Sequence, residues 1–313
     1  MTENQHSNPY EIAMRVLKLE KSRNRWRWVA VVAFVLFLLT VSALEATPAK
    51  RPAKFIAQVH VSGMITDTLH QQDVLERIRT NDNAKALLVY VDSPGGTMVG
   101  GVSLHRMLRE ISQSKPVVIV MGTVAASAGY MVASAGDYVI ANEGTLTGSV
   151  GVLMPLMDAT GLAGKVGVRS DEIVSGDLKA VTSPLYTRSA SDRAYLQDTV
   201  MQMQKVFLDL VNAQRDLTPE TVQLISDGRI ITGTKAKELN LVDALGDRRT
   251  AKQWLADTHE LDVATPIIEF DLVEKQSLVK ELLQGVDSYF FGSQFMNKFV
   301  NGTPQHAIMA VQY

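Results

Sequence analysis

Between residues 55 and 142, short apolar runs alternate with segments in which apolar residues recur every three or four positions. Continuous apolar runs are typical of strands buried on both faces of a sheet, whereas the longer spacing is typical of amphipathic helices. The predicted strands are FIAQVHVSG (55–63), AKALLVYVD (84–92), KPVVIVMG (115–122) and DYVIAN (137–142), and the predicted helices cover 70–82, 102–111 and a stretch from about Ser127. This alternation predicts an α/β domain with mostly parallel strands.

The pattern changes after Gly144. Residues 144–154 (GTLTGSVGVLM) are rich in Gly and Thr and predict short strands. Ser189 is a suitable N-cap for a long helical pattern that continues to Asp216. The remaining sequence predicts a helix within 217–228, a short helix, strand and turn within 232–247, and helical stretches at 251–260 and 276–291.

The N-terminal region has an apolar pattern of another kind. Residues 28–44 (WVAVVAFVLFLLTVSAL) carry no charge, and this length is close to the roughly 20 residues that a membrane-spanning helix needs. Basic residues in front of the run predict a cytoplasmic N-terminus, with the rest of the chain across the membrane. These residues are Arg15, Lys18, Lys21, Arg23, Arg25 and Arg27.

Two interpretations of this apolar run remain open. The run could be a cleaved signal peptide, with cleavage after Ala43 or Ala46. We favour an uncleaved signal anchor, because the segment before the run is long and resembles a short cytoplasmic helix. The predicted organisation is a cytoplasmic segment (1–27), an anchor (28–44), a linker (45–54), a folded domain (55–250) and a helical extension with a tail (251–313).

Length and composition narrow the possible functions. The 313 residues are 46% hydrophobic and 20% charged, which is enough for a sizeable core. The net charge of −2 does not suggest a nucleic-acid partner held by bulk charge. The absence of cysteine excludes disulfides, thiolate metal sites and a cysteine nucleophile. We expect neither a cofactor nor a metal ion.

Three loops rich in small residues are candidates for chemistry: DSPGG (92–96), AASAGY (125–130) and TGSVG (147–151). A Gly pair between a buried strand and a helix exposes backbone amides that can bind an anion, either a phosphate or a transient oxyanion. Ser127 begins a predicted helix one strand after such a loop. As a nucleophile, its hydroxyl needs a base.

The base is not evident from the residues. No histidine lies between His105 and His259, so a Ser-His-Asp triad lacks its usual member. A neutral lysine can replace histidine, since desolvation favours the uncharged amine. Lys165, Lys179 and Lys205 are equally available on composition alone. The residues by themselves therefore predict a serine hydrolase with an unusual base.

Several segments occur in the order found in SppA-like signal peptide peptidases: VDSPGG, VAASAGYMVAS, GTLTGSVGV, SGDLKAVTSP and DGRIITGTKAKELNLVDALGD. The sequence resembles this family over about residues 55–246. The resemblance implies a fold of the Clp protease and crotonase group. It also implies a serine endopeptidase that degrades remnant signal peptides and similar peptides rich in small residues.

The resemblance implies roles for individual residues. Ser127 matches the nucleophile, Lys179 in SGDLKAVTSP matches the general base, and Ser149 matches the serine that orients the lysine. Ser134, the second serine of the same stretch, is expected to be packed in the interior.

The resemblance also implies an oxyanion hole made by the amide of Gly95 or Gly96 together with that of Ala128. Family members usually carry glycine at the position of Ala128. Alanine keeps the N–H donor, although glycine tolerates unusual backbone angles better.

Members of the family assemble into rings or domes in which neighbouring subunits supply the serine and the lysine. The resemblance therefore implies a homo-oligomer, an octamer being one form, with shared active sites. It also implies a single-pass protein of the bacterial inner membrane, with its catalytic domain on the periplasmic side and cleaved signal peptides as substrates. Two alternatives are a catalytically weak membrane scaffold or quality-control protein of the same fold, and a crotonase-type enzyme acting on acyl-CoA.

Overall fold

The structure is a computed structural model that describes residues 25–37, 39–40 and 52–273. Residues 25–37 and 39–40 are helical. Within the described residues, no helix combines the length and the hydropathy that a membrane crossing requires. Parts of the predicted anchor and linker, and all of the helical pattern at 276–291, lie outside the described residues.

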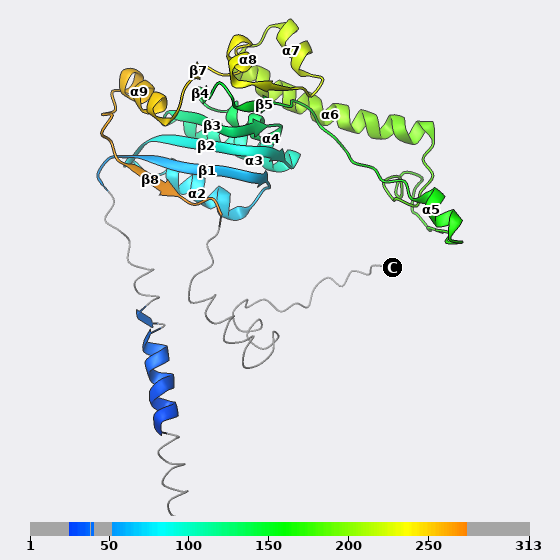
Figure 1. Cartoon of the computed structure of the whole chain (residues 1–313), viewed down its shortest axis with the longest axis horizontal. Helices are drawn as coiled ribbons and strands as arrows, with labels where there is room; N and C mark the ends of the chain where they lie inside the picture. The colour runs from blue at the N-terminus through cyan, green and yellow to red at the C-terminus, as the bar shows by residue number, and fades with distance from the viewer. Residues whose placement is uncertain (1–24, 38, 41–51, 274–313) are drawn as a thin grey trace, which may run out of the picture. The chain divides into compact units, whose positions relative to one another are not determined.

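A single sheet organises residues 52–273 (Figure 1). Its order is β6-β5-β3-β2-β1-β8, and β4 and β7 extend it beside β3. Every pairing is parallel except that of β5 with β6. The strands are β1 (Phe55–Ile65), β2 (Ala84–Gly96), β3 (Val117–Ala126), β4 (Tyr138–Ala141), β5 (Leu146–Gly148), β6 (Ile230–Thr232), β7 (Ala244–Leu245) and β8 (Ile267–Phe270). The predicted α/β class with a mostly parallel sheet is confirmed, and the architecture is consistent with a Clp protease and crotonase-like fold.

Strand β3 has two different neighbours on one side. Its first half, Val118–Val120, pairs with β4, and its second half, Val124–Ala126, pairs with β5. The chain leaves β4 at Ala141 and returns to the same sheet at Leu146. This change of partner brings the end of β5 beside the end of β3.

Most of the described helices begin where capping side chains satisfy free backbone amides, although α4 and α5 have no such cap. Threonine side chains cap α2, α3, α7 and α8. Ser189 caps α6 in a capping box with Asp192, as the sequence predicts. The helices are α2 (Leu69–Arg79), α3 (Met98–Ser112), α4 (Ala128–Ala133), α5 (Thr160–Lys165), α6 (Ala190–Arg215), α7 (Pro219–Ile225), α8 (Gly233–Glu238) and α9 (Arg248–His259).

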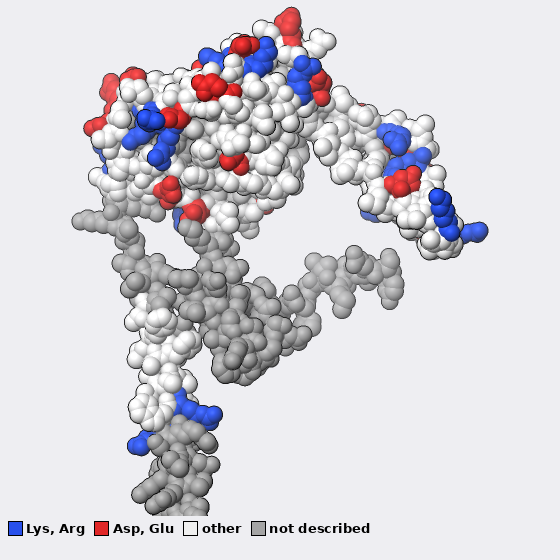
Figure 2. Space-filling model, in the orientation of Figure 1, with Lys and Arg blue, Asp and Glu red and all other residues white. Residues whose placement is uncertain are grey.

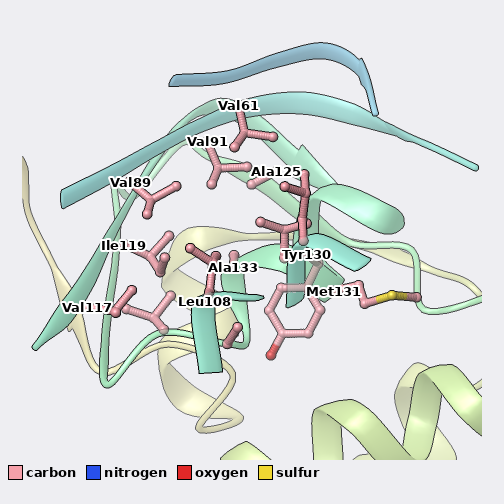
Figure 3. Close-up of a cluster of buried hydrophobic side chains, with 14 of the residues drawn as sticks. Val61, Val89, Val91, Leu108, Val117, Ile119, Ala125, Tyr130, Met131 and Ala133 are labelled. Atoms are coloured by element: carbon pink, nitrogen blue, oxygen red, sulfur yellow. The ribbon is translucent and has the colours of Figure 1, made fainter. Parts of the chain in front are cut away.

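The larger part of the core lies between one face of the sheet and helices α3 and α4. Figure 3 shows strand side chains such as Val89 and Ile119 directed towards Leu108 of α3 and Tyr130 of α4. The hydroxyl of Tyr130 donates a hydrogen bond of 3.0 Å to the Leu241 carbonyl. A second cluster on the opposite face packs α9 against β2, β3 and β4. Both faces of the central strands are buried, as their continuous apolar runs predict.

The sequence pattern missed three short elements and misjudged one strand end. Strands β6 and β8 and helix α5 are each six residues or fewer and show little periodicity. Strand β8 lies beyond residue 250 and pairs with β1. Strand β2 continues through residues 93–96, where a loop was predicted, because β1 also extends and pairs Ile65 with Gly96.

His105 is buried in α3 with only 2% of its surface exposed, and neither ring nitrogen has a hydrogen-bond partner among the described residues. Burial lowers the pKa of His105 from 6.5 to about 4, and the nearby charges of Arg109 and Arg106 act in the same direction. The folded protein therefore excludes a proton that the unfolded chain binds. Acid should favour the unfolded state through this residue.

We expect the free energy of unfolding to fall as the pH falls from about 6.5 to about 4, by about 3 kcal/mol in total from His105. Urea unfolding of wild type and His105→Leu, followed by tryptophan fluorescence at each pH, measures this contribution. The wild type should lose stability more steeply than the variant. Exposed His259 provides the control, and His259→Gln should follow the wild type. Parallel curves for wild type and His105→Leu would contradict the prediction.

Candidate active site

The carboxyl ends of three neighbouring strands meet at one edge of the sheet. Strand β2 ends at Gly96, β3 ends next to Ser127, and β5 ends next to Ser149. The last pair in the register of β3 with β5 is Ala126 with Gly148, so the two serines follow paired residues. In parallel sheets, ligands bind at this edge. The three loops singled out in the sequence are therefore brought together.

Ser127 occupies an unusual backbone conformation between β3 and α4. Its φ is 54° and its ψ is −124°, a region that residues other than glycine rarely adopt. Hydrogen bonds fix the residue on both sides: its amide donates to the Gly148 carbonyl at 2.9 Å, and its carbonyl accepts from the Met131 amide at 2.9 Å. A serine on such a sharp strand-to-helix turn presents its hydroxyl at the edge of the sheet.

Gly95 lies against Ser127 and has no room for a side chain. A Cβ atom on Gly95 would lie 2.9 Å from the Cβ and 3.2 Å from the Oγ of Ser127. The φ of Gly95 is +126°, which also favours glycine. The amide of Gly95 donates a hydrogen bond of 3.1 Å to the Oγ of Ser93.

Ser93 was not recognised as a site residue from the sequence, although it lies within the DSPGG loop. Its side chain is fully buried, and its hydroxyl donates to the carbonyls of Gly63 at 2.6 Å and Gly95 at 3.2 Å. Together with the bond from the Gly95 amide, these contacts hold the loop against the end of β1. Its position in a glycine loop after a strand was the available signal, but burial could not be inferred from the sequence.

Ser149 has a positive φ of 52° and is half-buried. Its amide donates to the Arg229 carbonyl at 2.7 Å, which connects it to the segment that precedes β6. Gly148, just before it, has a φ of +82° and lies so close to the Arg229 carbonyl that a Cβ would come within 2.9 Å. The second serine is thus fixed by its backbone, as Ser127 is.

A pocket of about 730 Å³ opens at this edge of the sheet, and Ser127 and Ser149 both line it. This volume is within the range of ligand-binding pockets in proteins. The residues of the predicted oxyanion hole, Gly95, Gly96 and Ala128, line the same pocket. Its other walls include Met64, Met98, Met131, Val152, Leu153, Met203 and Phe207. Five of the six predicted site residues therefore share one pocket.

Lys179 is the exception. It is exposed, lies in a turn where its amide donates to the Gly176 carbonyl at 3.0 Å, and does not line the pocket of Ser127. The turn belongs to residues 152–189, which we call the arm. The arm leaves the pocket at Val152, contains α5 and projects away from the sheet (Figure 1).

The arm is held together mainly by one side chain at its base. The guanidinium of Arg188 donates to the carbonyls of Val181 at 2.8 Å, Ser183 at 2.7 Å and Met157 at 3.1 Å. The amide of Ala159 also donates to the Pro184 carbonyl at 2.8 Å. These bonds join the outgoing and returning segments, and Ala180 and Val181, which follow Lys179, are buried. The arm therefore has a defined local structure.

The other candidates have ordinary structural positions. Ser134 is fully buried, and its hydroxyl donates to the Met131 carbonyl at 2.8 Å, so the prediction of an interior position is confirmed. Lys205 forms an ion pair with Asp209 on the surface of α6.

In the described part of the chain, no three His, Asp or Glu residues are grouped so that they could hold a metal ion. Figure 2 shows Lys and Arg interspersed with Asp and Glu over the visible face.

Comparison with known proteins places this arrangement in a family. Residues 109–262 match peptidase family S49. Over 237 residues, the chain is 36% identical to a putative protease of Synechocystis sp., covering 75% of this chain and 84% of that protein. It is 32% identical over 213 residues to a putative protease of Methanocaldococcus jannaschii, covering 68% of each chain. It is also 31% identical to a putative signal peptide peptidase SppA of Enterococcus faecium over 231 residues, 69% of this chain and 67% of that one.

We expect Gly95→Ala to abolish labelling of the protein by a fluorophosphonate, because the added methyl group displaces the Ser127 side chain. Gly63 is a matched control: its φ is also positive, at +67°, but no atom lies within 4 Å of the position that a methyl group would take there. Both variants should lose about 1–3 kcal/mol of stability from backbone strain. Gly63→Ala should still be labelled, and Ser127→Ala gives the background. Equal labelling of the two glycine variants would contradict the proposed contact.

Proposed function

The chain belongs to peptidase family S49 and is an SppA-like serine peptidase, and we propose that Ser127 is its nucleophile and Lys179 its general base. The observation that carries the first assignment is the strained, doubly hydrogen-bonded backbone of Ser127 at the edge of a pocket. Strain of this kind persists only where the surrounding structure enforces it, and it is concentrated at functional sites.

The reaction is an acyl transfer. The hydroxyl of Ser127 attacks the carbonyl carbon of the scissile peptide bond, and Lys179 accepts its proton and passes it to the leaving amine. Water then attacks the acyl-enzyme and releases the second product. Ser149, which lines the same pocket, orients the amine of Lys179.

Backbone amides stabilise the oxyanion that forms during both steps. The amide of Gly95 already donates to Ser93, so we expect Ala128 and Gly96 to be the main donors. The short helix α4 begins at Ala128, directly after Ser127, and the first amides of a helix have no partner within the helix. Removing one such donor typically raises the barrier by about 3–4 kcal/mol.

The base reaches the nucleophile across a subunit interface in this proposal. A lysine is a base only when its amine is uncharged, and the uncharged form is favoured by desolvation. Lys179 is exposed on the arm of its own chain, so that chain does not supply the desolvation. A neighbouring copy that receives the arm would bury the amine beside its own Ser127.

The composition of the arm supports this assembly. It carries apolar side chains that the described residues leave exposed, and exposed apolar surface of this kind marks protein interfaces. The most exposed of them are Leu153, Met157, Leu162, Val166 and Ile173. We propose a homo-oligomer, an octamer being one form, in which each active site takes Ser127 and Ser149 from one subunit and Lys179 from another.

We further propose that the protein is anchored by residues 28–44 in the bacterial inner membrane, with the peptidase domain on the periplasmic side. The uncharged run and the basic residues before it support this topology. Remnant signal peptides are then the proposed substrates, because they are released in the same membrane and are apolar and rich in small residues. The competing proposal is a catalytically weak scaffold of the same fold.

The first test concerns Lys179. Lys179→Ala should lower kcat for peptide hydrolysis by at least a thousandfold, and Lys179→Arg should not restore it, since a guanidinium does not become neutral in a protein. Lys165, in α5 of the same arm, is the matched control, and Lys165→Ala should keep its activity. Normal turnover by Lys179→Ala would refute the assignment of the base. A wild type that hydrolyses no peptide would favour the scaffold.

The second test concerns the sharing of sites. Ser127→Ala and Lys179→Ala are each expected to be inactive, but subunits exchanged between them form some sites with both residues intact. Activity should therefore return when the two inactive proteins are mixed and allowed to exchange. Exchange is verified independently by energy transfer between labelled subunits. A mixture that exchanges but stays inactive would show that each chain builds its own site.

A further inference from the structure

A second hollow adjoins the pocket of Ser127. It has a volume of about 770 Å³ and lies between α3 on one side and α6 on the other, and we call it the helix groove. Its apolar lining consists of Met98, Val99, Val102, Met107, Met203 and Val206. Polar and charged side chains also line it, namely Asp67, Gln72, Ser103, Arg106, Glu110, Thr199 and Gln202. Apolar atoms nevertheless make up most of its surface, and an apolar wall with polar groups beside it is typical of ligand-binding grooves.

The helix groove and the pocket of Ser127 share part of their lining. Met98 and Met203 line both hollows, one from the start of α3 and the other from α6. Met98 follows Gly96 by two residues, so the groove begins directly beside the loop that contains the proposed oxyanion donors. A peptide whose scissile bond lies at Ser127 can therefore continue into the groove without leaving the surface of the same subunit.

The chemistry of the walls indicates what this part of the peptide is. Three of the six apolar lining residues are methionines, whose flexible, polarisable side chains adapt to apolar groups of different shapes. Such walls bind aliphatic side chains without selecting a single one. They fit a substrate that is apolar over several residues but varied in sequence.

We propose that the helix groove binds an apolar segment of the peptide substrate a few residues from the scissile bond, and that it selects peptides with a long apolar stretch. This inference rests on the proposed peptidase activity of the adjoining pocket. Val99 and Val206 are the specificity-determining residues to examine, because they line the groove but not the pocket of Ser127. Both are exposed, so a smaller polar residue is compatible with folding.

The test compares hydrolysis of three fluorogenic peptides by the full-length protein in detergent. All three share one short cleavable sequence; one has no extension, one has four leucines added on each side, and one has four serines added on each side. The wild type should cleave the leucine-extended peptide with a kcat/KM about tenfold above that of the serine-extended one. In Val99→Ser and Val206→Ser this ratio should fall towards one, with cleavage of the short peptide unchanged.

Met201 is the matched control, since it is an exposed apolar residue of α6 that lines neither hollow. Met201→Ser should keep the wild-type ratio. The inference is overturned if the groove variants keep that ratio. It is also overturned if they lower cleavage of all three peptides together with a change of subunit number by light scattering, because the groove is then a contact between copies. If the wild type cleaves none of the peptides, the proposed function fails as well.

Discussion

The hydrogen bond from the amide of Ser127 to the carbonyl of Gly148 joins the ends of two neighbouring parallel strands, and the geometry of the pocket depends on it. It carries the register of β3 with β5 one residue beyond the last sheet pair. The chain then turns into α4 with a positive φ at Ser127. Because β5 is held in turn by antiparallel β6, the segment that precedes β6 becomes part of the same wall through the bond from Ser149 to Arg229.

Backbone strain at this edge is offset by the packing beneath it. Positive φ values at two residues other than glycine cost about 1–3 kcal/mol each. Helix α4 is short but all of its residues are buried, and Tyr130 within it is anchored to the Leu241 carbonyl. Burial also raises the pKa of Tyr130, so its hydroxyl remains a hydrogen-bond donor. A short helix without a side-chain cap is thus fixed by its burial rather than by its own propensity.

The sequence predicted the features that depend on long patterns. The runs of β1, β2 and β3, the helices α3 and α6 and the cap at Ser189 all follow from periodicity or capping chemistry. Strands β6 and β8 escaped prediction because three or four residues carry too little periodicity. The conformations of Ser127 and Ser149 could not be predicted for a different reason. Serine does not usually adopt a positive φ, and in both residues the amide is held by a hydrogen bond to a residue distant in sequence. The small-residue loops already indicated Ser127 as a candidate nucleophile, whereas the family resemblance was needed to select Ser149 and Lys179.

Lys179, the proposed base, is exposed and lies away from the pocket of Ser127 in the single chain. Its sequence neighbours do not distinguish it from Lys165, and both are exposed in the single chain. The pocket holds Ser127, the proposed nucleophile, and Ser149, the proposed orienting serine, but Lys179, the proposed base, is not among its described lining residues. If the arm of a neighbouring copy completes the pocket, one contact buries both the amine of Lys179 and the apolar side chains of the arm. Burial of the amine favours its uncharged form, which is the form that acts as a base. Peptide hydrolysis would then depend on assembly, and an isolated subunit would carry an inert serine.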